Sequence, residues 1–296
     1  MNTRELRTNK QKAFTYAMVL IPFILFVYIL IFPLGTSVYY SLCSWKGVGT
    51  PKFIFFDNFS KLFRDKNFWL VVKNTFVYSI YCTIGQVGFA LIISLLLNGR
   101  LLKLKGLHRA VIFFPVVMAP VVVGFVWKIA YNADYGFINT ILSAIGLGGS
   151  IQLWLDNPDI ILTTVSIPVI WQYIGLYMVM LLSAMSSIDP SIYECAELDG
   201  ANGFQRATKI TLPLIWNMLK IVIILVASGT MKIYDHIIAL TGGGPGRSSM
   251  SMAVYAYQNT FKFTNFGYGA AISVMILVFA GGIGLMVNAI MGRSKT

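Results

Sequence analysis

The 296-residue sequence contains few charged residues: Asp, Glu, Lys and Arg together make up 11% of it, and only 11 residues are acidic. Soluble proteins carry about 25% charged residues, so this chain has too few to cover the surface of a soluble fold of its size. Hydrophobic residues make up 57%, and the mean hydropathy is +0.72. The composition excludes an ordinary soluble protein and indicates an integral membrane protein.

Cysteine is also scarce, with three residues in the chain. Cys43 falls in a predicted outer loop, Cys82 in a predicted span and Cys195 in a predicted inner loop. Thiols separated in this way by a bilayer cannot form a disulfide framework, and their spacing matches no metal site. We therefore expect no disulfide framework and no bound metal.

Motifs for nucleotide binding and catalysis are missing as well. The stretch TGGGPG at 241–246 resembles a phosphate-binding loop in composition, but Arg247 follows it instead of the Lys-Ser/Thr pair that such a loop needs. No set of nucleophile and base is recognisable, so we expect no catalytic residues. The sequence predicts that the chain itself is not an enzyme and that another protein supplies ATP hydrolysis if solute is pumped.

Six long hydrophobic runs are present instead. Each has the length, about 20 residues, that a helix needs to cross a bilayer, and helices are expected because lipid leaves backbone polar groups no other partners. The first run, which starts at Ala13, is too long for a signal peptide and no cleavage site follows it. We predict an all-α integral membrane protein with spans at 13–38, 71–97, 109–131, 159–184, 213–238 and 266–291.

The net charge of +12 is concentrated beside these runs, in the basic clusters at 4–12 and 100–109. Basic residues next to spans are typical of cytoplasmic segments. No basic face alternates with exposed aromatic residues, which argues against nucleic-acid binding. The distribution predicts that both termini lie in the cytoplasm.

Polar side chains inside the predicted spans point to function, because each is costly unless it faces a cavity or a partner. Most are neutral amides, hydroxyls or aromatic groups, and the series of buried carboxylates that a proton-driven carrier needs is absent. Lys232 and Asp235 are expected on one side of the fifth span. The set favours an uncharged, hydroxyl-rich solute such as a sugar; the alternative is that these side chains hold the helices together.

One polar segment, 185–213, separates the fourth and fifth spans. Asp189 and Pro190 are typical of the start of a helix, which is expected to end at the turn residues 199–200. A second short helix is expected at about 203–210. Three of the eleven acidic residues of the chain lie within six positions of this segment: Glu194, Glu197 and Asp199.

This segment resembles the EAA loop of the membrane subunits of binding-protein-dependent ABC importers. The family pattern, roughly EAAxxDGAx5FxxIxLP, matches residues 194–213 in spacing throughout, with Cys195 in place of an alanine and Ala207 in place of an aromatic residue. The stretches 57–63 (DNFSKLF) and 234–245 (YDHIIALTGGGP) resemble the carbohydrate-uptake branch of the family. The nearest type is the first membrane subunit of maltose and glycerol-phosphate transporters.

The resemblance implies a coupling helix that contacts a cytoplasmic ATPase subunit. ATP and Mg would be bound by two such partner subunits, and this chain would bind no cofactor. The residues implied in the contact are Glu194, Ala196, Asp199, Gly200 and Ala201.

Further partners follow from the resemblance: a homologous second permease subunit, either distinct or a second copy, and an extracellular or periplasmic solute-binding protein that delivers a sugar. The chain would lie in a bacterial-type cell (inner) membrane. The family takes its substrate path from the fourth and fifth spans, which gives Gln172, Tyr173, Gly229 and Thr230 as candidates.

The predicted organisation has three regions: 1–70 with a cytoplasmic tail, the first helix and an outer loop; 71–291 with a five-helix core and the coupling loop 185–213; and the tail 292–296. Two alternative functions stay open. The same architecture could import glycerol phosphate, an amino acid or a peptide, for which only Lys220 and Lys232 offer basic groups in the relevant spans. A secondary carrier is less favoured because it leaves the loop unexplained.

Overall fold

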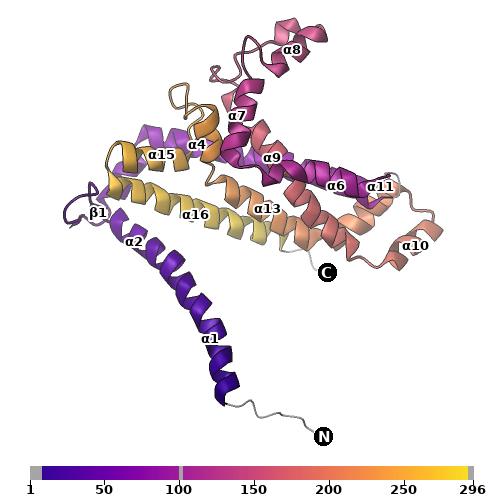
Figure 1. The fold of residues 1–296 in the computed structure, drawn as a ribbon, viewed down its shortest axis with the longest axis horizontal. Helices are drawn as coiled ribbons and strands as arrows, with labels where there is room; N and C mark the ends of the chain where they lie inside the picture. Colours follow the sequence, from indigo (N-terminus) through magenta and orange to yellow (C-terminus); the bar gives the residue numbers. More distant parts are fainter. Residues whose placement is uncertain (1–8, 100–102, 293–296) are drawn as a thin grey trace.

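The computed structural model describes residues 9–99 and 103–292 of the chain (Figure 1). Arg100 and the outer parts of both predicted cytoplasmic tails, 1–8 and 293–296, lie outside the described residues. In the described ranges nearly every element is helical, and the only sheet pairs two short antiparallel strands, β1 (Cys43–Ser44) and β2 (Lys52–Phe53). The predicted all-α class is confirmed.

Within the described residues, four helical segments are long and apolar enough to cross a membrane, and two bent pairs of helices bring the number to six. The chain is therefore a multi-pass membrane protein, while its orientation and its division into three regions stay predictions. The segments, in which π-helical and 3-10 turns are labelled η, are α1–η1–α2 (Asn9–Phe26, Val27–Ile31, Phe32–Ser41), α4–η2–α5 (Lys66–Cys82, Thr83–Val87, Gly88–Asn98), α6–η3 with α7 (Lys105–Phe113, Phe114–Val117, Pro120–Ala130), α9 (Ile161–Ser186), α11–η5–α12 with α13 (Gly203–Arg206, Ala207–Thr211, Leu212–Leu214, Trp216–Thr230) and α16 (Phe266–Met291).

Shorter helices fill the connections between these segments. Figure 1 places α8 on an arm that projects from the bundle and α10 at one end of it. The connecting elements are α3 (Asp57–Arg64), α8 (Phe137–Ala144), η4 (Gly148–Ser150), α10 (Pro190–Leu198), α14 (Asp235–Leu240), α15 (Met252–Tyr257) and η6 (Gln258–Lys262).

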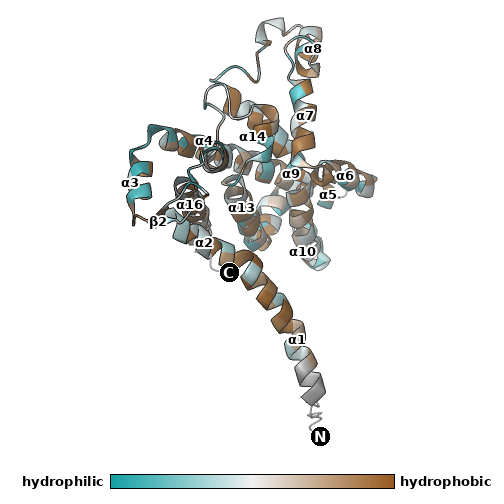
Figure 2. Cartoon of the chain, turned by 60° about the vertical axis from the view of Figure 1, so that its left-hand side comes forward, coloured by the Kyte–Doolittle hydropathy of each residue, from teal (hydrophilic) through white to brown (hydrophobic). Residues whose placement is uncertain are grey.

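The first helix stands apart from the rest of the molecule. α1 extends away from the bundle, and only α2 at its far end lies against α16 (Figure 1). The segment is hydrophobic along most of its length (Figure 2), yet none of the most apolar window of 14–41 is buried. A helix that is apolar all round must be covered by lipid or by another protein.

α9 is the most buried of the spanning helices. Of its most apolar window 56% is buried, against 33% for Lys66–Asn98 and 17% for α16. It contacts α4, α5, α6 and α13. Its side chains Val165, Met178 and Leu181 are fully buried, so α9 forms the centre around which the other spans are arranged.

The third predicted span, 109–131, is wrong as a single straight helix. It divides into α6–η3 and α7, which meet at an angle of 99°. Pro120 opens α7, and Ala119 before it is extended, with ψ 136°. A residue that precedes proline is pushed out of the α region, and proline cannot donate the next helical hydrogen bond, which accounts for the break.

The fifth predicted span, 213–238, is also interrupted. Helices Gly203–Leu214 and α13 meet at 74°, α13 ends at Thr230, and α14 begins only at Asp235. Lys232 thus lies in the irregular segment 231–234 rather than on a helix. The expectation that Lys232 and Asp235 share one side of a continuous helix is wrong.

Side chains from neighbouring elements satisfy the backbone carbonyls at these irregular places. Pro168 inside α9 cannot bond to the carbonyl of Thr164, and the Tyr131 hydroxyl donates to that oxygen at 3.0 Å. The Ser251 hydroxyl donates to the Ile233 carbonyl at 2.6 Å. Broken helices are tolerated in a membrane when freed backbone groups find such partners.

The glycine-rich segment 241–246 forms a tight loop held by hydroxyl groups. Ser249 Oγ donates to the Gly244 carbonyl at 2.6 Å, and the Tyr78 hydroxyl of α4 donates to the Ser249 carbonyl at 2.8 Å. Gly242 and Gly243 have φ of 64° and 97°, a region that glycine adopts far more readily than other residues. These glycines shape a turn packed on α4.

Removal of the Tyr131 hydroxyl is expected to destabilise the protein. Tyr131→Phe keeps the ring but leaves the buried Thr164 carbonyl without its partner, at a cost of about 1–3 kcal/mol. The midpoint of thermal unfolding of the purified protein in detergent should fall. Tyr135→Phe is the matched control, because Tyr135 is 70% exposed. Equal midpoints for the two variants would contradict this role for Tyr131.

Candidate functional site

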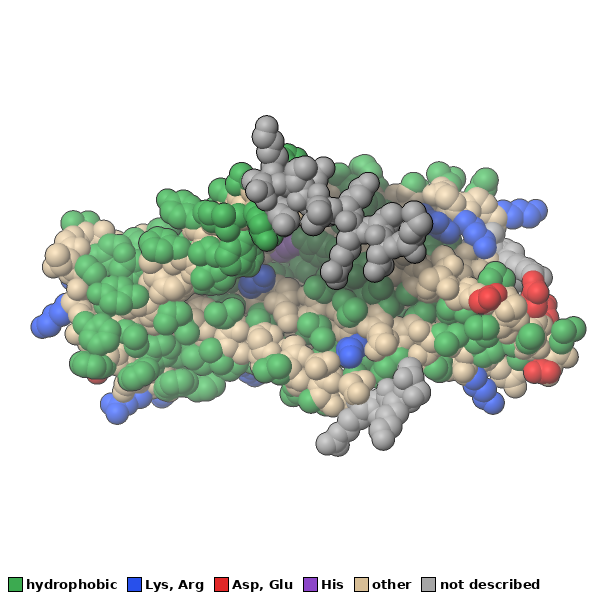
Figure 3. All heavy atoms as spheres, turned by 90° about the horizontal axis from the view of Figure 1, so that it is seen from below, with side chains coloured by type: hydrophobic (Ala, Val, Ile, Leu, Met, Phe, Trp, Pro, Cys, Tyr) green, Lys and Arg blue, Asp and Glu red, His purple; other side chains and the backbone are tan. Residues whose placement is uncertain are grey.

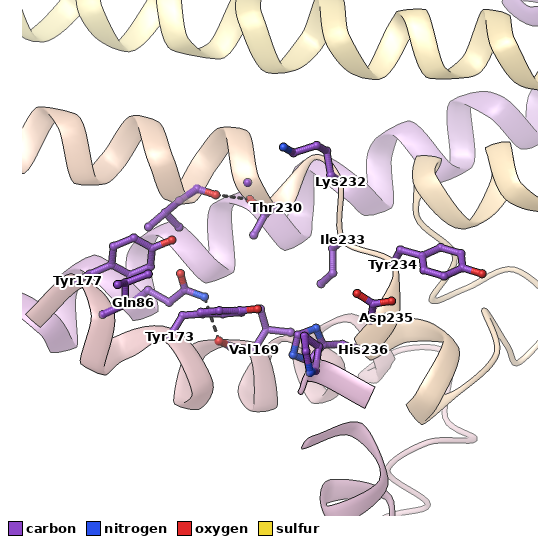
Figure 4. A pocket seen from close by; sticks show the side chains of 14 residues that line it. Gln86, Val169, Tyr173, Tyr177, Thr230, Lys232, Ile233, Tyr234, Asp235 and His236 are labelled. Carbon is purple, nitrogen blue, oxygen red and sulfur yellow. Dashed lines mark hydrogen bonds between the residues drawn. The ribbon is translucent and has the colours of Figure 1, made fainter. Parts of the chain in front are cut away.

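A cavity of about 220 Å³ lies between α9 and the segment that joins α13 to α14 (Figure 4). Its lining combines aromatic rings with a few polar and charged groups. Its polar and aromatic lining residues include Gln86, Tyr173, Tyr177, Thr230, Lys232, Asp235 and His236. Mostly apolar and aromatic walls with a few convergent polar groups are typical of small-molecule sites.

One wall of the cavity is a face of α9. Tyr173 and Tyr177 are four residues apart and therefore lie on the same side of the helix. Gln86, from the π-helical turn of the second span, lies beside them, and its amide donates to the Val169 carbonyl at 3.0 Å. The Gln86 side chain thereby joins the second span to α9 at the cavity wall.

The opposite wall is the end of α13 and the irregular segment after it. A Cβ atom added at Gly229 would meet no atom within 4 Å, so glycine leaves open space there. The Thr230 hydroxyl donates within its own helix, to Val226 at 2.8 Å or Ala227 at 3.0 Å. Its oxygen keeps acceptor capacity.

Gln172 lies behind the cavity wall and is fully buried. Its amide nitrogen donates to the Met118 carbonyl at 2.7 Å, at the break of the third span. Its amide oxygen is 2.6 Å from His236 Nε2, which must be the donor because that oxygen can only accept. The His236 ring meets the Tyr173 ring edge-on at 6.1 Å. Gln172 therefore ties α7, α9 and α14 together and supports Tyr173 from behind.

Three of the four residues predicted for the substrate path, Tyr173, Gly229 and Thr230, line the cavity, whereas Gln172 does not. Sequence reasoning missed Tyr177, which its spacing of four from Tyr173 could have revealed. It also missed the contributions of Asp235 and His236, because nothing in the hydrophobic pattern marks the end of α13 at Thr230. Whether solute passes these residues stays a prediction.

The polar segment between α9 and α13 folds as predicted into two short helices. Asp189 begins α10, where its side chain accepts from the Ser191 amide at 2.9 Å, and this hydrogen bond holds the pKa of Asp189 below its usual value. Gly200, with φ 75°, ends the helix. In the second helix, Asn202 and Gln205 cap each other reciprocally at 2.8 and 2.9 Å.

Contacts between the two helices fix their relative position. Arg206 Nη1 lies 3.3 Å from Glu197 Oε2, and the Tyr193 hydroxyl is 3.1 Å from Thr211 Oγ1. Because the Arg206–Glu197 pair is largely exposed, its contribution is small, and the half-buried Tyr193–Thr211 contact is the firmer link.

The five residues predicted for ATPase contact lie on α10 and the turn after it. Glu194, Asp199 and Gly200 are exposed, Ala201 is half-buried, and Ala196 is 7% exposed. The neighbouring Leu198 and Phe204 are 88% and 78% exposed. Figure 3 shows acidic side chains gathered at this end of the molecule beside hydrophobic ones. Such a surface is suited to docking another protein, although the contact itself stays a prediction.

Comparison with known proteins gives consistent relatives over nearly the whole chain. The chain is 30% identical over 283 residues to the probable ABC transporter permease protein YurN of Bacillus subtilis, covering 94% of this chain and 96% of that protein. It is 31% identical to the lactose transport system permease protein LacF of Rhizobium radiobacter, covering 84% of each. It is 26% identical to the diacetylchitobiose uptake system permease protein NgcF of Streptomyces coelicolor, covering 97% and 86%.

The fold also matches a solved structure. A chain of a bacterial ABC transporter involved in the import of the acidic polysaccharide alginate superimposes with a TM-score of 0.83 at 24% identity, covering 97% of this chain and 98% of that one. No family model matches the sequence.

Gln172→Leu is expected to lower thermal stability more than any other single loss at this site. The substitution keeps the approximate volume but leaves the half-buried Met118 carbonyl and the buried His236 side chain unpaired, each at a cost of about 1–3 kcal/mol. The thermal midpoint in detergent measures the effect. Gln258→Leu is the control, since the structure gives that half-buried side chain no hydrogen bond. A midpoint equal to that of the control would show that Gln172 does not join the helices.

Proposed function

The chain belongs to the family of ABC transporter permease proteins, and we propose that it forms, with a homologous second permease subunit, the membrane path of an ATP-driven sugar importer. The observation that carries the proposal is the cavity between α9 and the end of α13, which presents tyrosine rings beside hydroxyl and amide groups. The relatives named for lactose and diacetylchitobiose transport support the same solute class.

The lining of the cavity suits a sugar better than a phosphorylated solute. Aromatic faces pack against the apolar faces of sugar rings, and hydroxyl, amide and carboxylate groups exchange hydrogen bonds with sugar hydroxyls. A phosphate group calls for several basic side chains. Among the described residues that line this cavity, Lys232 is the only Lys or Arg, and Lys220 is not one of them.

The second permease subunit, either distinct or a second copy, would cover the apolar surfaces that this chain leaves bare. The stretch 14–41 is long enough to span and is unburied along its most apolar window. It reaches well beyond the bundle (Figure 1). A neighbouring subunit on this arm would bury its apolar surface.

An ATPase subunit would dock on α10, with Glu194, Ala196, Asp199, Gly200 and Ala201 in or beside the contact. Docking would bury the exposed Leu198 and Phe204. The α10 helix is joined to the fifth span through the Tyr193–Thr211 contact. α13 then runs 15 residues, about 22 Å, from the bend at Ile215 to the cavity wall at Thr230. A displacement of α10 would thus reach the cavity through one helix.

The arrangement also supports a common side for α10 and the C-terminal end of the chain. Trp216 Nε1, at the start of α13, donates to the Met291 carbonyl at the end of α16 at 3.1 Å. A cytoplasmic α10 therefore goes with a cytoplasmic C-terminus. The solute-binding protein would deliver the sugar from the opposite side, and ATP and Mg would be held by the ATPase subunits.

Glu194→Lys or Gly200→Asp should abolish sugar uptake while the protein remains inserted in the membrane. The first reverses a charge on the docking helix; the second adds a carboxylate and forces a non-glycine residue to φ 75°. The measurements are sugar uptake by membrane vesicles and co-purification of the ATPase subunits.

Asp134→Lys is the matched control, because it reverses the charge of an exposed residue in the loop between α7 and α8, away from α10. Its uptake should equal that of the unmodified chain. Normal uptake with retained ATPase subunits in both coupling-loop variants would refute docking at α10.

A further inference from the structure

The cavity wall carries a carboxylate that nothing in the described part of the chain neutralises. Asp235 lines the cavity, and no described residue gives its side chain a hydrogen bond or an ion pair. Lys232, the cation nearest to Asp235 in the sequence, lies in the irregular segment 231–234. Its side chain points away from the Asp235 carboxylate, and Ile233 lies between the two side chains (Figure 4). Asp235 is thus an exposed, unpaired acid in a wall that is mostly aliphatic and aromatic.

Local structure fixes this carboxylate in place. Asp235 is the first residue of α14. The next residue, His236, is buried and bonded to Gln172 at 2.6 Å, which holds the start of α14 against α9.

The Tyr173 ring and this carboxylate line the same cavity. Figure 4 shows the ring lying below the space bounded by Thr230, Ile233 and Asp235, whereas the Lys232 side chain extends on the far side of Thr230. A sugar ring packed on Tyr173 would therefore lie on the side of this space that Asp235 borders. Two hydroxyls of that ring could donate to the carboxylate, which accepts only.

We propose that Asp235 is a specificity-determining residue that makes the cavity accept uncharged sugars and reject acidic ones. The proposal rests on the proposed function, in which this cavity takes a sugar. A uronate or sulfonate on the ring at Tyr173 would share a cavity of about 220 Å³ with the fixed carboxylate, and two like charges confined together repel each other. Discrimination then comes from a repulsive element built into the site.

The expected repulsion acts on an acidic group of the sugar ring that packs on Tyr173. The Lys232 side chain points away from the Asp235 carboxylate (Figure 4), and its ammonium can donate to a hydroxyl or ring oxygen elsewhere in the cavity. This placement gives opposite expectations for the two charged residues. Loss of Asp235 should improve the binding of acidic sugars, and loss of Lys232 should not.

The test uses the assembled transporter in lipid nanodiscs without its solute-binding protein, so that selection by the latter does not enter. Binding is measured by saturation-transfer difference NMR for four neutral disaccharides (lactose, maltose, cellobiose and diacetylchitobiose) and for digalacturonate. The unmodified transporter should bind at least one neutral sugar about tenfold more tightly than digalacturonate, and Asp235→Asn should bring the two affinities to within about threefold.

Two control variants separate the possible causes. Lys232→Gln should preserve the discrimination or increase it, and Asp134→Asn, which removes an exposed charge outside the cavity, should leave it unchanged. If Asp235→Asn binds the neutral sugar normally and still rejects digalacturonate, Asp235 serves only the stability of α14 and the proposal fails. If no sugar binds the unmodified transporter, the proposed function fails instead.

Discussion

The architecture depends on the pairing of backbone groups where helices break inside an apolar environment. Lipid supplies no hydrogen bonds, so each freed carbonyl needs a side-chain partner. Tyr131 supplies one for Thr164, Gln172 for Met118 and Ser251 for Ile233. Each donor comes from an element other than the one it caps. The breaks are therefore also the joints through which separate helices are fixed to one another.

The cavity is a consequence of these joints. It lies where α13 has ended and α14 has not begun, and it is bordered by Pro120 at the break of the third span. Gln172 connects the break of the third span to His236, whose ring contacts the Tyr173 ring. The same irregular backbone exposes Asp235 on the wall. At the other end of α13, a bend of 74° leads to the helical segment Gly203–Leu214, which packs on α10. This segment and α13 therefore connect the proposed site of ATPase docking to the proposed sugar site.

The sequence was sufficient for the parts of the fold that local chemistry decides. Hydrophobic length gave the six spans, and Asp189, Pro190 and Gly200 gave the limits of α10. The breaks were not predictable, because proline marks a possible kink but not its angle: Pro120 accompanies a bend of 99° while Pro168 stays inside α9. The end of α13 at Thr230 depends on tertiary contacts, such as the hydrogen bond from Ser251 to the Ile233 carbonyl. Because α13 ends there, Asp235 and His236 lie in the site and Gln172 lies behind it.

The central claim is that α10 and the cavity wall move as one body. Spin labels would be placed at Ile192 on α10 and Ile238 on α14, which are both exposed, and a third at the exposed Leu285 on α16 serves as reference. Distances between labels would be measured by pulsed electron paramagnetic resonance in the assembled transporter, with and without a non-hydrolysable ATP analogue. The account predicts a constant distance between 192 and 238 while both shift relative to 285. A change between 192 and 238 with no shift of 238 relative to 285 would contradict it.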